Sequence, residues 1–279
     1  MITQPNVKIN LGLNILRKRP DGYHDLETVF VPCYDIYDRL EIIKGDDWSE
    51  TSAALFAKYR EDQIAQAISP DGKVMITIAR EEGVDWEPLS DLTARACLLL
   101  AQDHVLPPLK IFLEKRSPVG AGLGGGSSDA AFALKMVNEL CGLGLQECRI
   151  AEYAATLGSD CAFFVYNRPM FGQGRGEILE DFPLDMRGYE LKVVIPDGVS
   201  VSTAEAYRGI VPATPDVPLK DVLAHPVTEW RGLLANDFES TVFDKHPILS
   251  HIKDSLYESG AVYASMSGSG SALFGIYKK

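Results

Sequence analysis

The chain has 279 residues, of which 46% are hydrophobic and 24% are charged, and its formal net charge at pH 7 is −12. A chain of this kind can form one large domain or two ordinary ones around a sizeable core. The acidic balance argues against a general binder of nucleic acid or of a membrane surface, because those polyanions attract positively charged proteins. A single phosphorylated ligand remains compatible with it, since backbone N–H groups and one lysine can bind a phosphate locally.

Cysteine usage predicts a reducing compartment. The five cysteines form no C-x-x-C pair, which argues against a zinc site and favours free thiols over disulfides. The sequence has no apolar run of membrane-spanning length, and its first residues do not resemble a signal peptide. We therefore expect a cytoplasmic protein.

The first third of the chain mixes strand and helix signals. Strands with apolar alternation are predicted at residues 7–16, 39–43 and 74–78. Apolar residues at helical spacing follow a Ser-Asp pair that ends at Asp91, which predicts a capped helix over 92–103. Residues 45–70 begin acidic and then become helix-like, with Leu55, Tyr59 and Ile64 roughly on one side, and no motif explains the role of residues 46–72.

A glycine-rich loop is the most informative segment. The apolar run from Leu109 to Leu113 predicts a strand, and helical spacing resumes near Ser128. The loop reads Pro118-Val119-Gly120-Ala121-Gly122-Leu123-Gly124-Gly125-Gly126-Ser127-Ser128. Glycine lets a backbone approach a ligand closely, and the N–H groups at a helix N-terminus attract anions. A strand, a glycine loop and a helix in this order predict a phosphate-binding site.

The second half begins with another helix, which is expected to end at Gly158. A domain boundary is expected near residues 158–165. Further strands are predicted at residues 190–195 and 272–277, and further helices at residues 219–224, 233–242 and 247–259.

The glycine loop also matches the dinucleotide pattern G-x-G-x-x-G over residues 120–125. That match is weak in so glycine-rich a segment, and a dinucleotide fold needs a second strand soon after its helix. Here a second helix follows, which disfavours a dinucleotide-dependent oxidoreductase. The lysine ending of a Walker loop and the partner motifs of protein kinases are also missing.

The longer loop, with its proline and its two serines, resembles the central motif of the GHMP small-molecule kinases. Lys8-Ile9-Asn10-Leu11-Gly12-Leu13 resembles the first motif of that family, and residues 265–274 resemble the third. The resemblance implies a two-domain α+β fold, with an N-terminal domain like the second domain of ribosomal protein S5 and a ferredoxin-like C-terminal domain. It implies that residues 1–160 form the ATP-binding domain and residues 161–279 the substrate-binding domain.

Within the family, the segments 5–10, 19–24 and 157–160 resemble kinases that act on a cytidine diphosphate-linked methylerythritol. The resemblance implies transfer of the ATP γ-phosphoryl group to the C2 hydroxyl of this small molecule in the non-mevalonate isoprenoid pathway. No nucleic-acid or membrane partner is implied. Another alcohol kinase of the family, of the homoserine or mevalonate type, and an inactive binding module remain alternatives.

Two residues carry the catalytic role that the resemblance implies. Asp160 would orient the acceptor hydroxyl and accept its proton, although a helix cap is the ordinary interpretation of an aspartate there. Lys8 would keep Asp160 ionised and offset charge on the transferred group, although a solvated strand lysine is the ordinary alternative.

The remaining site residues would bind the two substrates. The loop residues 118–128 would hold the ATP phosphates, and Ser128 would reach Mg²⁺, with Ser127 as the near alternative and helix capping equally open for both. The resemblance assigns Tyr23 to stacking on cytosine and His24 to hydrogen bonding with it. It places Asn10 beside the reacting hydroxyl and Tyr207 as a second aromatic wall.

Overall fold

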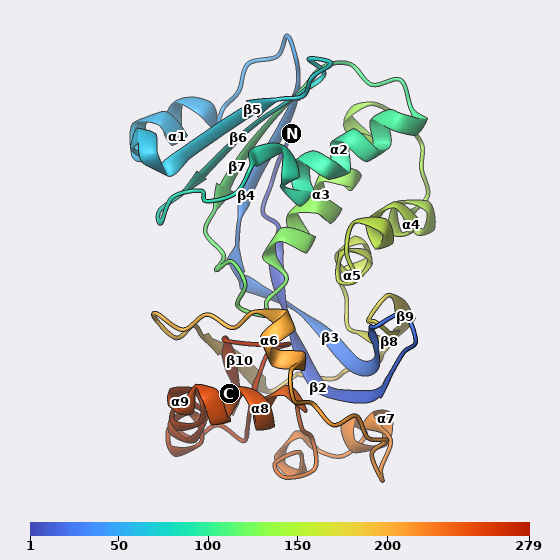
Figure 1. Cartoon of the computed structure of the whole chain (residues 1–279), viewed down its shortest axis with the longest axis vertical. Coiled ribbons are helices and arrows are strands. Elements are labelled where there is room, and N and C mark those ends of the chain that lie inside the picture. The colour runs from blue at the N-terminus through green and yellow to red at the C-terminus, as the bar shows by residue number, and fades with distance from the viewer. The chain divides into compact units, whose positions relative to one another are not determined.

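The computed structural model describes residues 1–279 as two compact units (Figure 1). Unit 1 comprises Met1–Val7, Tyr34–Val119 and Gly124–Asn167, and unit 2 comprises Lys8–Cys33, Gly120–Leu123 and Arg168–Lys279. The chain therefore passes between the units several times, and the glycine loop contributes to both. The functional division at residue 160 stays a prediction. No helix is both long enough and apolar enough to cross a membrane.

Unit 1 contains a five-stranded sheet in the order β1-β4-β7-β6-β5. Its strands are β1 (Ile2–Thr3), β4 (Arg39–Lys44), β5 (Ile64–Ile68), β6 (Val74–Arg80) and β7 (Leu109–Lys115). Only β6 and β7 pair in parallel, and the other neighbours are antiparallel. β7 is the strand that leads into the glycine loop, so this sheet fixes where the loop begins.

Helices lie on both faces of that sheet. The helices of unit 1 are α1 (Ser52–Lys58), α2 (Leu92–Asp103), α3 (Gly125–Leu140), α4 (Glu147–Leu157) and α5 (Cys161–Tyr166), and α4 and α5 pack against the other helices. In Figure 1, α1 lies on one side of the strands while α2 and α3 lie on the other. Leu55 of α1 packs with Ile43, Ala79 and Phe112 from the sheet, which explains why this short helix is stable there.

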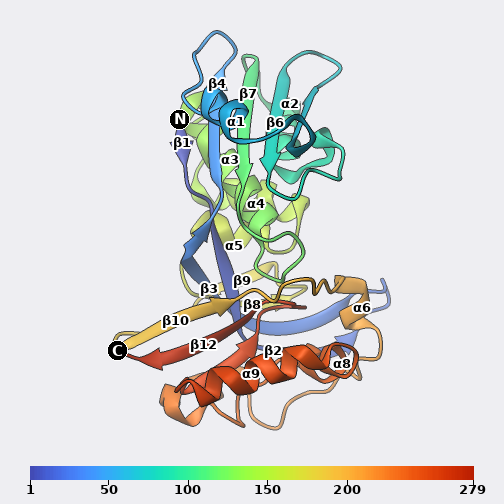
Figure 2. The same cartoon turned by 90° about the vertical axis from the view of Figure 1, so that its left-hand side faces the viewer.

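Unit 2 contains two antiparallel sheets, ordered β2-β3-β8-β9 and β10-β12-β11. The strands are β2 (Asn6–Lys18), β3 (His24–Tyr37), β8 (Met170–Gly174), β9 (Ile178–Asp181), β10 (Tyr189–Val194), β11 (Tyr263–Met266) and β12 (Leu273–Lys278). The helices are α6 (Thr203–Tyr207), α7 (Leu219–Leu223), α8 (Phe238–Lys245) and α9 (Pro247–Glu258). Figure 2 shows α9 running alongside the three-stranded sheet, in contact with β11 and β12.

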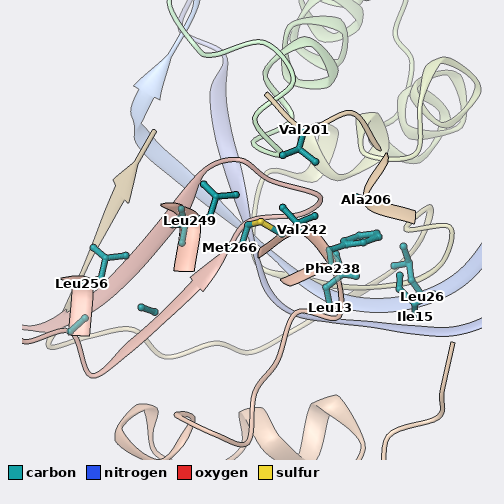
Figure 3. Packing of buried hydrophobic residues seen from close by; sticks show 13 residues of the cluster. Leu13, Ile15, Leu26, Val201, Ala206, Phe238, Val242, Leu249, Leu256 and Met266 are labelled. Carbon is teal, nitrogen blue, oxygen red and sulfur yellow. The ribbon is translucent and has the colours of Figure 1, made fainter. Parts of the chain in front are cut away.

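The core of unit 2 joins segments that are far apart in the sequence (Figure 3). Leu13 from β2 lies in one cluster with Phe238 and Val242 from α8 and Met266 from β11. All four side chains are at least 97% buried. Since β2 also carries two of the predicted site residues, this core holds them against the C-terminal part of the chain.

Most predicted elements are confirmed with small shifts at their ends. Asp91 accepts a hydrogen bond from the Thr93 N–H group at 2.9 Å and so caps α2 as predicted. α3 begins at Gly125 rather than near Ser128, because Gly124 takes a left-handed backbone conformation and ends the loop. α4 ends at Gly158 as predicted.

Two predicted helices differ from the structure. The helix-like pattern that included Ile64 is wrong, because Ile64 starts β5 and pairs with Ala79, a contact that local spacing does not reveal. The helix predicted over 233–242 begins only at Phe238, since Asn236 pairs with Leu13 of β2. The long strand β3 was not predicted because its charged residues and a proline interrupt the apolar alternation.

Candidate active site

Lys8 is buried, which makes the interpretation as a solvated strand lysine wrong. Only 3% of the residue is exposed. Its Nζ donates hydrogen bonds to Asn10 Oδ1 at 2.6 Å and to the Gly122 carbonyl oxygen at 2.7 Å. A buried ammonium needs such partners, because an unpaired charge inside a protein is costly. The first motif and the glycine loop are thus in direct contact.

Asn10 is fixed by bonds at both ends of its amide. Its oxygen accepts from Lys8, and its Nδ2 donates to Thr28 Oγ1 at 3.0 Å. Thr28 in turn donates to the Gly12 carbonyl oxygen at 2.6 Å. These bonds determine which end of the amide faces Lys8, so a ligand would meet an already oriented group.

The Gly122 segment of the loop packs against the third motif. Gly122 has φ +75°, and a Cβ atom there would lie 2.1 Å from the Ser267 carbonyl oxygen, so only glycine fits. Ser267 Oγ donates to the Gly122 carbonyl oxygen at 3.0 Å, and the Ala272 N–H donates to Ala121 at 3.1 Å. Unit 2 therefore brings parts of all three motifs together.

Asn236 supports the third motif and was missed by sequence reasoning. Its Nδ2 donates to the carbonyl oxygens of Met266 at 2.8 Å and Gly268 at 2.9 Å. Its Oδ1 accepts from the Phe238 N–H at 3.0 Å. A lone asparagine carries no motif, so only the fold reveals that it clamps this turn.

The other end of the glycine loop opens α3 in unit 1. Gly125, Gly126 and Ser127 occupy the first turn, whose N–H groups have no acceptors inside the helix. Ser128 Oγ is fully buried and has no hydrogen-bond partner. Its side chain therefore makes no capping hydrogen bond, and its role as a metal ligand stays a prediction.

The predicted catalytic base lies at the start of α5. Asp160 occupies the cap position, but its carboxylate makes no capping hydrogen bond to the first turn. Ser159 Oγ donates to Asp160 Oδ1 at 3.3 Å. Helix capping therefore does not account for this aspartate. Asp160 belongs to unit 1 and Lys8 to unit 2, and their pairing stays a prediction.

A buried ionic cluster lies beneath the loop in unit 1; we call Asp38, Lys115, Ser117 and Asp129 the Lys115 cluster. Lys115 pairs with Asp38, and its Nζ is 2.7 Å from Asp129 Oδ2 and 3.3 Å from Ser117 Oγ. Asp38 also accepts from the Arg116 and Ser117 N–H groups at 2.6 and 2.7 Å. The cluster thus ties the segment before the loop to the helix after it.

The two carboxylates of this cluster have different surroundings. Asp129 has one partner, and its Oδ1 is buried without any. Burial, followed by repulsion from Asp38, raises the pKa of Asp129 well above its usual range, while Lys115 opposes this. Asp38, in contrast, accepts four hydrogen bonds, two from backbone N–H groups and two from the Lys115 and Ser117 side chains.

Three predicted substrate residues lie close together in unit 2; we call Tyr23, His24 and Tyr207 the aromatic group. The His24 and Tyr207 rings stack with centroids 4.7 Å apart and planes 18° apart. That spacing leaves no room for a base between them, so a ligand would meet their edges or outer faces. Tyr23 is next to His24 in sequence and is 57% exposed.

His24 carries a perturbed ring. Burial, with a smaller contribution from the nearby Lys18 charge, lowers the pKa of His24 below 6.5. The imidazole is therefore neutral near pH 7 and offers one hydrogen-bond donor and one acceptor. A neutral ring of this kind can match an edge that also carries both donors and acceptors.

Comparison with known proteins agrees with this fold and these motifs. Residues 91–168 match the model of the GHMP kinases N terminal domain, and residues 219–279 match that of GHMP kinases C terminal. A solved crystal structure of mevalonate kinase covers the whole chain and 91% of its own length with a TM-score of 0.60, but at 13% identity it shows the fold alone. The class is thus a GHMP kinase with the expected α+β fold.

Nearer relatives narrow the class. A 4-diphosphocytidyl-2-C-methyl-D-erythritol kinase from Bacteroides fragilis is 47% identical over 99% of this chain and 92% of its own. The crystal structure of a 4-(cytidine 5'-diphospho)-2C-methyl-D-erythritol kinase is 30% identical, with a TM-score of 0.74 and coverage of 99% of this chain and 89% of its own. The chain belongs to the 4-diphosphocytidyl-2-C-methyl-D-erythritol kinase family. It is an enzyme, a phosphotransferase that uses ATP as co-substrate and acts on an alcohol group of a small molecule.

Proposed function

We propose that the chain transfers the γ-phosphoryl group of ATP to the C2 hydroxyl of 4-(cytidine 5'-diphospho)-2-C-methyl-D-erythritol, in the non-mevalonate isoprenoid pathway. The 47% identity to a kinase of that name over nearly the whole chain is the observation that carries the proposal. The reaction forms a bond between the acceptor oxygen and phosphorus and breaks the bond between that phosphorus and ADP. We place this reaction in the cytoplasm.

Asp160 and Lys8 prepare the acceptor. Asp160 orients the hydroxyl and takes its proton as the new bond forms. The Lys8 ammonium stabilises that carboxylate and the charge on the moving phosphoryl group. The buried position of Lys8 supports this role, because low exposure strengthens its electrostatic effect. Asn10, already fixed by Lys8 and Thr28, positions the polyol.

The glycine loop, residues 118–128, holds the nucleotide phosphates through the backbone N–H groups that follow Pro118 and through the N-terminal end of α3. The buried Ser128 hydroxyl, which lacks a partner, fits a ligand of Mg²⁺. No cluster of His, Cys, Asp or Glu side chains forms a separate metal site. Mg²⁺ in kinases binds mainly to nucleotide phosphates and water, with one or two protein oxygens, and supplies charge neutralisation there.

The aromatic group recognises the cytidine part. Tyr23 offers its exposed ring for stacking on cytosine, and the neutral His24 edge pairs with the donors and acceptors of the base. Tyr207, held by its stack on His24, completes the aromatic surface. The Tyr207 ring also makes an edge contact with the Phe238 ring, which supports this group within unit 2.

The test is an assay of acceptor-dependent ADP release by the purified chain, with ³¹P NMR of the product. We expect turnover with the cytidylylated methylerythritol and none with homoserine or mevalonate. Methylerythritol 4-phosphate should be a far poorer acceptor. Comparable rates with the uncytidylylated compound would contradict cytosine recognition, and ATP binding without any turnover would favour a binding module.

Asp160→Asn is the matched variant for this assay. We expect kcat to fall by about 10²- to 10⁴-fold, because the amide cannot accept the proton. Binding of ADP, measured by calorimetry, should change less than twofold. Near-normal turnover in this variant would remove Asp160 from the role of base.

A further inference from the structure

The turn between β8 and β9 brings Arg175 to Tyr23. β8 pairs antiparallel with β3, and Gly174 lies opposite Leu26. The residues that follow Gly174 and the residues that precede Leu26 therefore lie at the same end of the two paired strands. The Arg175 guanidinium carbon lies 5.0 Å from the centre of the Tyr23 ring, within the range of a cation–π contact.

The turn is built so that Arg175 is held in place. The glycines on either side of Arg175 both have positive φ, +70° for Gly174 and +108° for Gly176. Gly176 N–H donates to the Gln173 carbonyl oxygen at 3.0 Å. Glu177 accepts from the Arg175 N–H at 2.5 Å and from its Nε at 3.3 Å. Backbone and side chain are thus both fixed.

The neighbouring strand is equally constrained. A Cβ atom at Gly172 would lie 2.5 Å from the Phe30 ring, so β8 must approach β3 closely at this point. This close pairing of β8 with β3 places the turn that follows Gly174 beside the residues that precede Leu26, including Tyr23. Tyr23 itself is 57% exposed, so its ring presents surface to solvent in addition to the part that Arg175 covers.

We propose that Arg175 is a positioning residue that holds the Tyr23 ring for stacking on the pyrimidine base of the acceptor. This inference rests on the proposed function. The guanidinium lies over one face of the ring and restricts its rotation, and the other face receives the base. Arg175 contacts neither edge of the base, so it raises affinity for cytosine and uracil alike and leaves the choice between them to His24.

The experiment compares Arg175→Met, Arg175→Lys and the control Arg187→Met. Arg187 also pairs with a carboxylate, that of Asp185, but its side chain is largely exposed. For Arg175→Met we expect the KM of the cytidylylated acceptor to rise about three- to fivefold, the usual worth of an exposed cation–π contact. For Arg175→Lys, the KM of the acceptor should lie between the values of the unmodified enzyme and Arg175→Met. In both variants kcat and the KM of ATP should change less than twofold, and in Arg187→Met all three constants should change less than twofold.

A double-mutant cycle with Tyr23→Ala separates positioning from charge attraction. If Arg175 acts through the ring, Arg175→Met adds nothing to the effect of Tyr23→Ala. Saturation-transfer NMR with cytidine monophosphate and uridine monophosphate should show the same relative loss for both. An unchanged KM in Arg175→Met, or full additivity in the cycle, overturns the inference. Absence of turnover by the unmodified enzyme would instead contradict the proposed function.

Discussion

The Lys115 cluster and the aromatic group are built in opposite ways. The Lys115 cluster is 95% buried or more and holds its charges with hydrogen bonds among β7, Ser117, Asp38 between β3 and β4, and Asp129 of α3. The aromatic group is partly exposed and is held by ring contacts and by backbone hydrogen bonds of Tyr23. A buried charge network tolerates no loss of a partner, whereas exposed rings adapt at small cost. We therefore expect changes on the phosphate side to affect turnover or folding, and changes on the base side to affect affinity.

Apart from the Asp160→Asn variant described above, the largest expected effect is that of Lys8→Ala on turnover. The change removes a buried positive charge beside the proposed phosphoryl-transfer site and leaves Asn10 Oδ1 without its donor. We expect kcat to fall by about 10²- to 10³-fold with little change in the KM of ATP. Steady-state kinetics measure both, and thermal melting checks the fold. The exposed Lys44→Ala enzyme is the control, and an unchanged kcat in Lys8→Ala would contradict the role.

Next in size is the effect of Lys115→Met on stability. The variant leaves the Asp38 and Asp129 carboxylates buried without their shared cation, which costs about 3–5 kcal/mol of the free energy of unfolding. Denaturant titration measures this loss. Lys192→Met, which breaks an ion pair on an exposed strand, should cost less than about 0.5 kcal/mol. Equal losses in the two variants would show that burial does not distinguish these sites.

A third prediction compares the stability of variants at the two carboxylates of the Lys115 cluster. Asp129→Asn should cost less than Asp38→Asn, because burial already raises the pKa of Asp129 and favours its neutral form. Asp38→Asn instead keeps an oxygen for the Arg116 and Ser117 N–H groups but replaces Oδ2 by an NH2 group. That group cannot accept the hydrogen bonds from Lys115 Nζ and Ser117 Oγ. We expect a difference of about 1–2 kcal/mol in unfolding free energy between the variants. The reverse order would contradict this difference between the two carboxylates.

The sequence predicted those features of the molecule that depend on residues close together in the chain. The three motifs, the α2 cap and the end of α4 depend on neighbours in the chain, and the structure brings Lys8, Asn10 and Gly122 into direct contact. Asp38, Asn236 and Arg175 were not found because each acts on residues between 30 and 152 positions away. Their partners are set by strand register and by loop packing, which no local pattern encodes.

The smallest expected effect is the pH dependence of acceptor binding through His24. Burial lowers the pKa of His24 below 6.5, so the ring stays neutral near pH 7 and gains its proton only at lower pH. Protonation replaces the ring's acceptor with a second donor, and the charge adds to that of the nearby Lys18. The KM of the cytidylylated acceptor should therefore rise about fivefold as pH falls through that lowered pKa, the worth of about one hydrogen bond. Because His24→Gln keeps a donor and an acceptor but cannot titrate, its KM should not change over the same range, nor should the KM of ATP in either enzyme. A pH-dependent KM that survives in His24→Gln would place the titrating group elsewhere.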